Sequence, residues 1–218
     1  MARPTQTIQA MFATPFVQVQ MPDAAPLLAE LRALFLARET DEYRYPLERA
    51  TQRGVYESRF DLFKWDDAPV KKMVAFCHGT LSSVVMRINQ YTEAEMDKLD
   101  FHYEAWFHVT RTGGFQGLHI HPNASWSGII CVDPGDSPED ADYSGVVRYH
   151  DPRLHITMHE DAGNRQLVPP FTTGGYDVRH APGQLIVMPS YLHHEIFPYM
   201  GKRPRIVVAF NCAITRKP

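Results

Sequence analysis

Two histidines one residue apart, His119 and His121, lie in the stretch LHIHPNASWSG (residues 118–128). On a β-strand, residues i and i+2 point to the same side, so a strand through this stretch would present both imidazoles to one space. Two imidazoles that face one pocket can supply two ligands of a metal site. An H-x-H pair alone is more typical of structural histidines, with one ring in water at a strand edge and the other donating to a backbone carbonyl. A metal site therefore needs a third group.

A second source of histidine lies near the end of the chain. The apolar run in GQLIVMPSYLHHEIFP (residues 183–198) leads to His193 and His194. A further histidine at the mouth of a β-fold would give the three-point arrangement that a metal site requires. Arg205 then opens the apolar run RIVVAFN (residues 205–211). An arginine that enters a buried strand is costly unless an anion meets it, and a carboxylate bound by two hydrogen bonds would serve.

The elements that position these residues change character at about residue 100. Residues 7–20 read as a short extended segment, and the next stretch predicts a helix because Leu27, Leu28, Leu31, Leu34 and Phe35 recur at helical spacing. Residues 66–98 predict a second long helix, whereas residues 41–65 indicate only a loop or a short strand. After residue 100, short β-prone runs alternate with Gly, Pro and Asp. This order predicts a β-sandwich or barrel with N-terminal helices packed outside it.

Length and composition favour one globular domain, residues 1–218, with an N-terminal support (1–99) and a β-core (100–218). Hydrophobic residues make up 44% and charged residues 22% of the chain, and the net charge is −3. No basic cluster is long enough to follow a phosphate backbone, which argues against nucleic acid as a partner. We expect neither a signal peptide nor a membrane span, and hence a cytoplasmic protein. The spacing of Cys77, Cys131 and Cys212 suits reduced thiols, and the apolar stretches around Cys131 and Cys212 suit burial of those two.

The ordered set of motifs resembles the Fe(II)- and 2-oxoglutarate-dependent oxygenase superfamily, and within it a family of 2OG-Fe(II) oxygenases. The motifs are MFATPF (11–16), HIHPNASWSG (119–128), DPR (151–153) and PSYLHHEIFP (189–198) followed by an arginine strand, and the resemblance spans about residues 8–214. It implies a mainly β fold, a double-stranded β-helix (a cupin-like jelly roll). It also implies an iron enzyme that hydroxylates a small-molecule substrate while 2-oxoglutarate and O₂ become succinate and CO₂.

Carried over by position, the resemblance makes His119 the first iron ligand. His194 is the distal ligand, because His194-Glu195-Ile196-Phe197-Pro198 fits the superfamily's H-x-V-x-P element. Arg205 matches the residue that grips the far carboxylate of 2-oxoglutarate, which suits a planar guanidinium. The superfamily often has Ser or Thr two residues later. Here that position is Val207, so another residue must bond the cosubstrate, and the candidates are Tyr103, Ser127 and Asn211.

The chain departs from the superfamily at residue 121, which is usually Asp or Glu and is His here. A three-histidine site carries one negative charge fewer, so it should hold Fe(II) less tightly. Asp151 is the alternative source of a carboxylate, although it could equally pair with Arg153 or bind substrate. We favour His121. Trp126, Arg148, Asp151 and Arg153 are expected substrate contacts, and Gly128 could leave room for a bound molecule.

Several features carry a structural interpretation as well. Gly113 and Gly114 fit either a bulge that aims the following strand or a plain hairpin turn. Trp106 and Trp126 are more typical of a β-core than of a pocket wall. The remaining histidines lack usable spacing and are expected to be structural or surface groups; these are His102, His108, His150, His155, His159 and His180.

Three other functions fit the same residues. A three-histidine cupin-like dioxygenase would use O₂ without 2-oxoglutarate, and Arg205 would then be a structural ion-pair partner. A jelly roll with a degenerate site would be a non-catalytic binding protein. A zinc hydrolase ranks last, because the helical H-E-x-x-H spacing is missing. The primary substrate, the choice among hydroxylation, desaturation and cyclisation, and a homodimeric state are left open by the sequence.

Overall fold

The computed structural model describes residues 7–47, 49–153, 156 and 159–218. The predicted residue His155 lies outside this range. The first half of the described chain contains β1 (Val17–Gln20), α1 (Ala25–Ala37), β2 (Gln52–Glu57), the 3₁₀ turn η1 (Leu62–Lys64), α2 (Ala68–Asn89) and α3 (Glu93–Met96). The second half contains β3 (Leu99–His119), β4 (Trp126–Asp133), β5 (Val147–His150), β6 (Gly175–Val178), β7 (Gln184–Pro189), β8 (His194–Ile196) and β9 (Arg205–Arg216).

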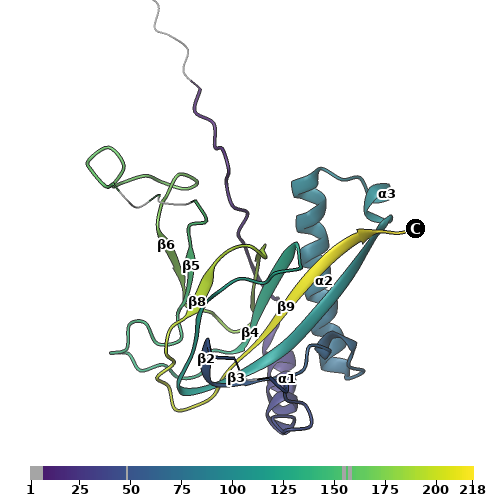
Figure 1. The fold of residues 1–218 in the computed structure, drawn as a ribbon. Coiled ribbons are helices and arrows are strands. Elements are labelled where there is room, and N and C mark those ends of the chain that lie inside the picture. The colour runs from purple at the N-terminus through teal and green to yellow at the C-terminus, as the bar shows by residue number, and fades with distance from the viewer. Residues whose placement is uncertain (1–6, 48, 154–155, 157–158) are drawn as a thin grey trace, which may run out of the picture.

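The strands form one curled antiparallel sheet with α1 and α2 against its outer face (Figure 1). The strand order is β1-β7-β4-β9-β3-β8-β5-β6, and β2 pairs with the free edge of β3. Strands that are far apart in the sequence, such as β3 and β9, are neighbours in the sheet. The predicted mainly β jelly roll with external N-terminal helices is confirmed.

Both long helices turn one apolar stripe to the sheet. Leu28, Leu31 and Phe35 of α1 are buried, and the Phe35 ring stacks on Phe107 of β3 at 4.6 Å between centroids. The second helix is shorter than the predicted range 66–98. It ends where Gln90 adopts a left-handed backbone conformation (φ +56°), and α3 then begins with a capping box at Thr92. The left-handed residue ends the second helix and the capping box starts a new one, although the apolar periodicity predicted one continuous helix.

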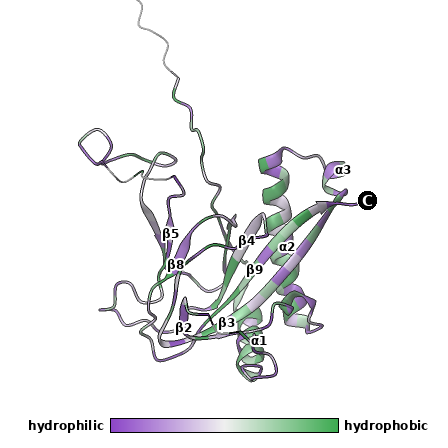
Figure 2. Cartoon of the chain, viewed as in Figure 1, coloured by the Kyte–Doolittle hydropathy of each residue, from purple (hydrophilic) through white to green (hydrophobic). Residues whose placement is uncertain are grey.

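The alternation along β9 separates two hydrophobic layers. Ile206, Val208 and Phe210 point outward to the helices, whereas Val207 and Ala209 point into the roll. Figure 2 shows the result as hydrophobic colour along α1, α2, β4 and β9, with more hydrophilic colour at β5 and β8. A strand that is buried on both faces reads as a continuous apolar run, which explains why the sequence alone does not reveal its inward side.

An irregularity in β3 moves this long strand from one neighbour to another. Its first half, Leu99–Thr110, pairs with β9, and its last part pairs with β8 through Gln116 and His119. Between the halves, the single residue Gly54 of β2, between Arg53 and Val55, faces the four residues 111–114 of β3. Gly113 lies in this bulge with φ +80°. The bulge interpretation of Gly113 and Gly114 is therefore correct, and the hairpin interpretation is wrong.

The three cysteines are free thiols, as expected, and Cys77 is buried as well as Cys131 and Cys212. Within the described residues, every helix is too short or too polar to cross a lipid bilayer.

A glycine in β4 tests the packing between the sheet and the helices. A Cβ atom at Gly128 would lie 2.2 Å from Cζ of the buried Phe210, so its missing side chain makes room for that ring and not for a ligand. We expect Gly128→Ala to lower the free energy of unfolding by roughly 1–3 kcal/mol, because overpacking forces the ring or backbone to move. Urea denaturation measures this change.

Gly79→Ala is the matched control for this substitution. Gly79 lies inside α2, and a Cβ atom there meets nothing within 4 Å. Alanine is the better helix former by about 0.8–1 kcal/mol, so this variant should be at least as stable as the wild type. Equal stability of Gly128→Ala and the wild type would contradict the packing argument.

Candidate active site

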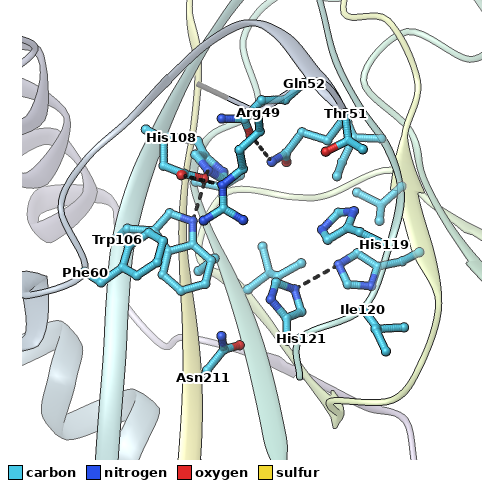
Figure 3. Close-up of a pocket in the computed structure, with 18 of the residues that line it drawn as sticks. Arg49, Thr51, Gln52, Phe60, Trp106, His108, His119, Ile120, His121 and Asn211 are labelled. Atoms are coloured by element: carbon cyan, nitrogen blue, oxygen red, sulfur yellow. Dashed lines mark hydrogen bonds and ion pairs between the residues drawn. The ribbon is translucent and has the colours of Figure 1, made fainter. Parts of the chain in front are cut away.

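Three imidazoles from separate parts of the chain meet inside the roll. One ring nitrogen from each of His119, His121 and His194 lies within 4.8 Å of the other two, and Nε2 of His121 is 3.3 Å from Nε2 of His194 (Figure 3). His119 and His194 are direct partners across β3 and β8. His121 lies two residues beyond the end of β3, where its backbone N–H donates to the Ser190 carbonyl at 3.0 Å. The strand ends earlier than expected, but both rings of the H-x-H pair still face one space.

The hydrogen bonds of two rings fix which nitrogen carries the proton. Nδ1 of His119 donates to the Gly117 carbonyl at 2.7 Å, and Nδ1 of His194 donates to the Leu192 carbonyl at 2.9 Å. Nε2 of each ring is then an unprotonated donor atom that faces the cluster. Metal-bound histidines are commonly oriented by the same kind of backbone contact on the other nitrogen.

Burial keeps these rings neutral. Burial, with a smaller effect of the neighbouring imidazoles, lowers the pKa of His121 to about 3 and the pKa of His194 well below the ordinary value. Burial also lowers the pKa of His119. A metal binds the neutral form of imidazole. A divalent cation can bind the unprotonated Nε2 atoms of His119 and His194 together with Nε2 of His121 beside them. The residues therefore fit a mononuclear Fe(II) site.

The structure does not bring Asp151 to the imidazoles. Asp151 follows β5, and Arg153 binds both oxygens of its carboxylate at 2.9 and 2.6 Å. This contact lowers the pKa of Asp151. Among the described residues, the three histidines form the one group of potential ligands that converges closely enough to hold an ion.

Arg205 lies in the same cavity as the histidines, as the first residue of β9. Its side chain is buried, and within the described part of the chain no carboxylate pairs with it. Its Nη2 atom instead lies 3.2 Å from Nδ1 of His180. Desolvation lowers the pKa of Arg205, and it lowers the pKa of His180 to about 3. A buried cation without a counter-charge is unfavourable, so this position suits an anionic ligand.

Two further buried polar atoms near Arg205 lack hydrogen-bond partners in the described structure. They are the Tyr149 hydroxyl oxygen and Nε2 of His180. The Tyr149 ring stacks on His194 at 5.6 Å between centroids. Because a buried polar atom without a partner is unfavourable, these groups are natural contacts for a bound polar molecule. His180 is therefore not an incidental histidine, and Tyr149 is a candidate that the sequence analysis missed.

The three residues expected to replace the missing Ser or Thr at Val207 lie in different places. Tyr103 points to the helix layer, where its hydroxyl lies 2.9 Å from Nδ1 of His78 in α2, so the structure does not bring it to the cavity. Ser127 donates to Oδ1 of Asn211 at 2.8 Å but does not line the cavity. Asn211 does line it, and the bond from Ser127 leaves its side-chain N–H groups available (Figure 3).

The expected substrate contacts lie outside this cavity. Trp126 packs in the hydrophobic cluster on the helix side of the sheet. Arg148 forms a two-pronged ion pair with Asp177, with both distances 2.7 Å, and lies 4.9 Å from the centre of the Phe197 ring. The period of two explains both misplacements, because the inward positions have the opposite parity: Ile129, three residues after Trp126, and Val147, next to Arg148. Arg153 pairs with Asp151, as described above.

One wall of the cavity comes from residues 41–65, which were predicted only as a loop or a short strand. Strand β2 and its flanks contribute Arg49, Gln52, Glu57 and Phe60. Glu57 faces His108 across the β2–β3 pair, with Oε2 2.9 Å from the imidazole Nε2. The remaining lining residues that matter here are Glu104, Trp106 and Gln116.

His108 and Trp106 were expected to be structural, yet both line the cavity. A usable signal was present, because Glu104, Trp106 and His108 share one face of β3 by the period of two. Burial, the largest effect, would raise the pKa of Glu57, but His108 and Arg49 together hold it below its ordinary value. Glu57 is therefore a buried carboxylate that keeps its negative charge.

Comparison with known proteins identifies the fold and the family. The family described as "Putative 2OG-Fe(II) oxygenase" matches residues 104–211, which contain His119, His121, His194 and Arg205. No curated protein sequence matches the chain.

Several solved structures resemble the fold over nearly the whole chain. A prolyl-4-hydroxylase from Pseudomonas putida matches with a TM-score of 0.60 and 19% identity, covering 95% of this chain and 94% of that one. HygX from Streptomyces hygroscopicus, solved with nickel, 2-oxoglutarate and hygromycin B, matches with a TM-score of 0.55 and 13% identity, covering 92% and 83%. A prolyl hydroxylase from Trichoplax adhaerens, in complex with a peptide fragment, matches with a TM-score of 0.57 and 11% identity, covering 91% and 83%.

The jelly roll and the family match together define a metal-dependent oxidoreductase. The chain belongs to the Fe(II)- and 2-oxoglutarate-dependent oxygenases, and its cofactors are Fe(II) and the cosubstrate 2-oxoglutarate.

Metal binding distinguishes His121 from Asp151 as the third ligand. We expect His121→Ala to weaken the binding of Mn(II) or anaerobic Fe(II) at least about tenfold. Substitution of a residue that only hydrogen-bonds to a metal ligand already weakens metal binding by about that factor. Asp151→Asn should stay within about twofold of the wild type, because Arg153 already holds that carboxylate away from the site. Calorimetric titration measures both affinities. The reverse order of effects would make Asp151 the ligand.

The pH dependence of stability tests the buried state of His180. In the unfolded chain its pKa is near 6.5 and in the folded chain about 3, so as the pH falls below 6.5 the unfolded state takes up the proton first. A group that is protonated only in the unfolded state lowers the free energy of unfolding by about 1.4 kcal/mol for each unit by which the pH falls. Between pH 6.5 and 5, the metal-free wild type should therefore lose ~2 kcal/mol more than His180→Asn. Urea denaturation in the presence of a chelator, repeated at several pH values, measures the free energy of unfolding of both proteins. Equal pH dependence of the two proteins would contradict the conclusion that His180 is buried and neutral.

Proposed function

We propose that His119, His121 and His194 hold Fe(II), that Arg205 binds the far carboxylate of 2-oxoglutarate, and that the enzyme hydroxylates a small-molecule substrate. In this reaction 2-oxoglutarate and O₂ are converted to succinate and CO₂. The observation that carries the proposal is the buried guanidinium of Arg205, which shares a cavity with three neutral imidazoles and pairs with no carboxylate of the described chain. A cation in that setting calls for an anionic ligand.

The same observation argues against the cupin-like alternative without 2-oxoglutarate. In that alternative Arg205 would be half of a structural ion pair. The nearby ionisable partner is His180, which is neutral because burial lowers its pKa to about 3. The one buried carboxylate that lines the cavity, Glu57, already contacts His108 and Arg49. Arg205 is therefore available to a ligand.

Each part of the chain has a distinct task in the proposed reaction. When bound, the iron supplies the redox chemistry with 2-oxoglutarate and O₂. Arg205 orients the cosubstrate from its far end, the unpartnered Tyr149 hydroxyl lies buried near that guanidinium, and the N–H groups of Asn211 offer a further polar contact. Apolar side chains, among them Ile129, Val207 and Ala209, exclude water from the same space.

The size of the cavity supports a small substrate. Its volume is about 230 Å³, slightly below the usual range of small-molecule sites. Solved relatives of the fold include one bound to hygromycin B and one bound to a peptide fragment, so the fold accommodates both kinds of substrate. A cytoplasmic location and a homodimeric state remain predictions.

The weak visible charge-transfer band of an iron-chelated 2-oxo acid tests the proposal without knowledge of the substrate. Anaerobic titration of the wild type with Fe(II) and 2-oxoglutarate should produce this band. Arg205→Gln should weaken 2-oxoglutarate binding about tenfold or more, because it removes a buried, charge-assisted contact. The titration measures the concentration of 2-oxoglutarate at half-maximal absorbance.

Arg203→Gln is the matched control. Arg203 lies two residues before Arg205, but its side chain is largely exposed and contacts the Gly135 carbonyl and Asp133. This variant should keep the wild-type titration. If iron binds but no band forms at saturating 2-oxoglutarate, the cosubstrate assignment fails. If no iron binds, the protein is a non-catalytic jelly roll.

A further inference from the structure

A second arginine, Arg49, lines the cavity together with Arg205. Arg49 precedes β2, and Figure 3 shows its guanidinium directed into the space between Trp106 and the imidazoles. Its side chain is 43% exposed, so it lies at the mouth of the cavity and not in the core. A group at the mouth is accessible to a molecule that enters from solvent.

The contacts of Arg49 fix the orientation of its guanidinium while leaving its outer edge free. Nε lies 3.2 Å from Oε1 of Glu57. The guanidinium carbon lies 5.3 Å from the ring centre of Tyr45 and 5.5 Å from that of Phe60, and these two rings stack on each other. Within the described residues, the two terminal nitrogen atoms form no hydrogen bond. They are a preoriented two-pronged donor, the geometry that matches a carboxylate.

The charges around the cavity favour an anion at this position. Glu57 is shared between Arg49 and His108, so its single charge offsets one cation. Glu104 also lines the cavity, but it is exposed to solvent, which screens its charge. His121 stands where the superfamily usually has a carboxylate, so the cavity holds one negative charge fewer. With Arg205 assigned to the cosubstrate, Arg49 is the cation left for the substrate.

An apolar surface connects Arg49 to the imidazoles. The Phe60 and Trp106 rings lie 4.6 Å apart, and Trp106 lies 5.8 Å from the ring of His121. A hydrocarbon chain or an aromatic ring can pack on Trp106 while its anionic end reaches Arg49. The carbon to be oxidised would then lie beside the metal ligands.

We infer that the primary substrate is a small organic acid, whose carboxylate Arg49 binds at the mouth and whose hydrocarbon part lies over Trp106. This inference rests on the proposed function, because it concerns the same site. It makes Arg49 a substrate-binding residue, distinct from the cosubstrate-binding residue Arg205.

Matched acids and amides test the charge requirement directly. The probes are butanoate, hexanoate, benzoate and 3-phenylpropanoate, the primary amide of each, and the amines butylamine and 2-phenylethylamine. Their affinities for the anaerobic Fe(II)-loaded protein are measured by calorimetry, with and without 2-oxoglutarate. At least one acid should bind ten times more tightly than its amide, because the neutral amide cannot form charge-assisted bonds with the guanidinium.

Variants of Arg49 locate the effect. Arg49→Gln should abolish the preference for the acid and leave the affinity for 2-oxoglutarate within about threefold of the wild type. Arg49→Lys keeps the positive charge but loses the planar two-pronged donor, so this variant should prefer the acid over the amide to an intermediate degree. Arg53→Gln is the control, since Arg53 is an exposed arginine four residues away that does not line the cavity. Circular dichroism checks that each variant is folded.

Three results would overturn the inference. They are a wild type that binds no acid more tightly than its amide, a preference for the amines, and an acid preference that survives in Arg49→Gln. Loss of 2-oxoglutarate binding in Arg49→Gln would also overturn it, because Arg49 would then belong to the cosubstrate. Failure of the wild type to bind 2-oxoglutarate would instead refute the proposed function, and the acid and amide titrations without 2-oxoglutarate would still report on Arg49.

Discussion

The metal-binding geometry depends on the change of neighbour along β3. This strand pairs with β9 over its first half and with β8 over its last residues, and the bulge at Gly113 makes the transition possible. His119 comes to lie directly opposite His194 as a result, although 75 positions separate the two numbers in the sequence. Backbone hydrogen bonds from Nδ1 of both rings then turn their Nε2 atoms to one point. Because β9 begins at Arg205, opposite Thr110, the later residues of β3 need a new partner, and β8 supplies it.

The electrostatics of the cavity follow from desolvation. Burial keeps the three imidazoles neutral and leaves Arg205 as a cation without a carboxylate partner in the described chain. Neutral nitrogen ligands suit a divalent metal, and the unpaired guanidinium suits the far carboxylate of 2-oxoglutarate. Each group is unfavourable alone in a low-dielectric interior, and each becomes favourable when its ligand binds. The site is thus arranged for its cofactors rather than for the stability of the empty fold.

The division of the cavity into two sides connects the family's chemistry to a choice of substrate. The jelly-roll side carries the histidines and Arg205, and it corresponds to the region that the family match covers. The other wall comes from β2 and its flanks, which lie outside that match and contribute Arg49, Glu57 and Phe60. Loops and added edge strands that border a conserved scaffold are where related enzymes commonly differ in specificity. The acid-binding role inferred for Arg49 belongs to this second wall.

The sequence by itself determined the fold class and the helix-then-strand order, and with the family resemblance it predicted three histidines as the metal centre and Arg205 as the cosubstrate anchor. Those predictions rest on local signals, namely apolar periodicity, the H-x-H spacing and an arginine at the head of a buried strand. Tertiary structure alone decided which side chains share the cavity. The phase of β4, which is buried on both faces, is invisible in its sequence, so Trp126 was assigned to the wrong side. Arg148 lies on the outer face of the alternating strand β5, where it pairs with Asp177. Glu57, His108 and Arg49 meet only because β2 pairs with β3, and such a non-local contact leaves no local pattern for sequence analysis to read.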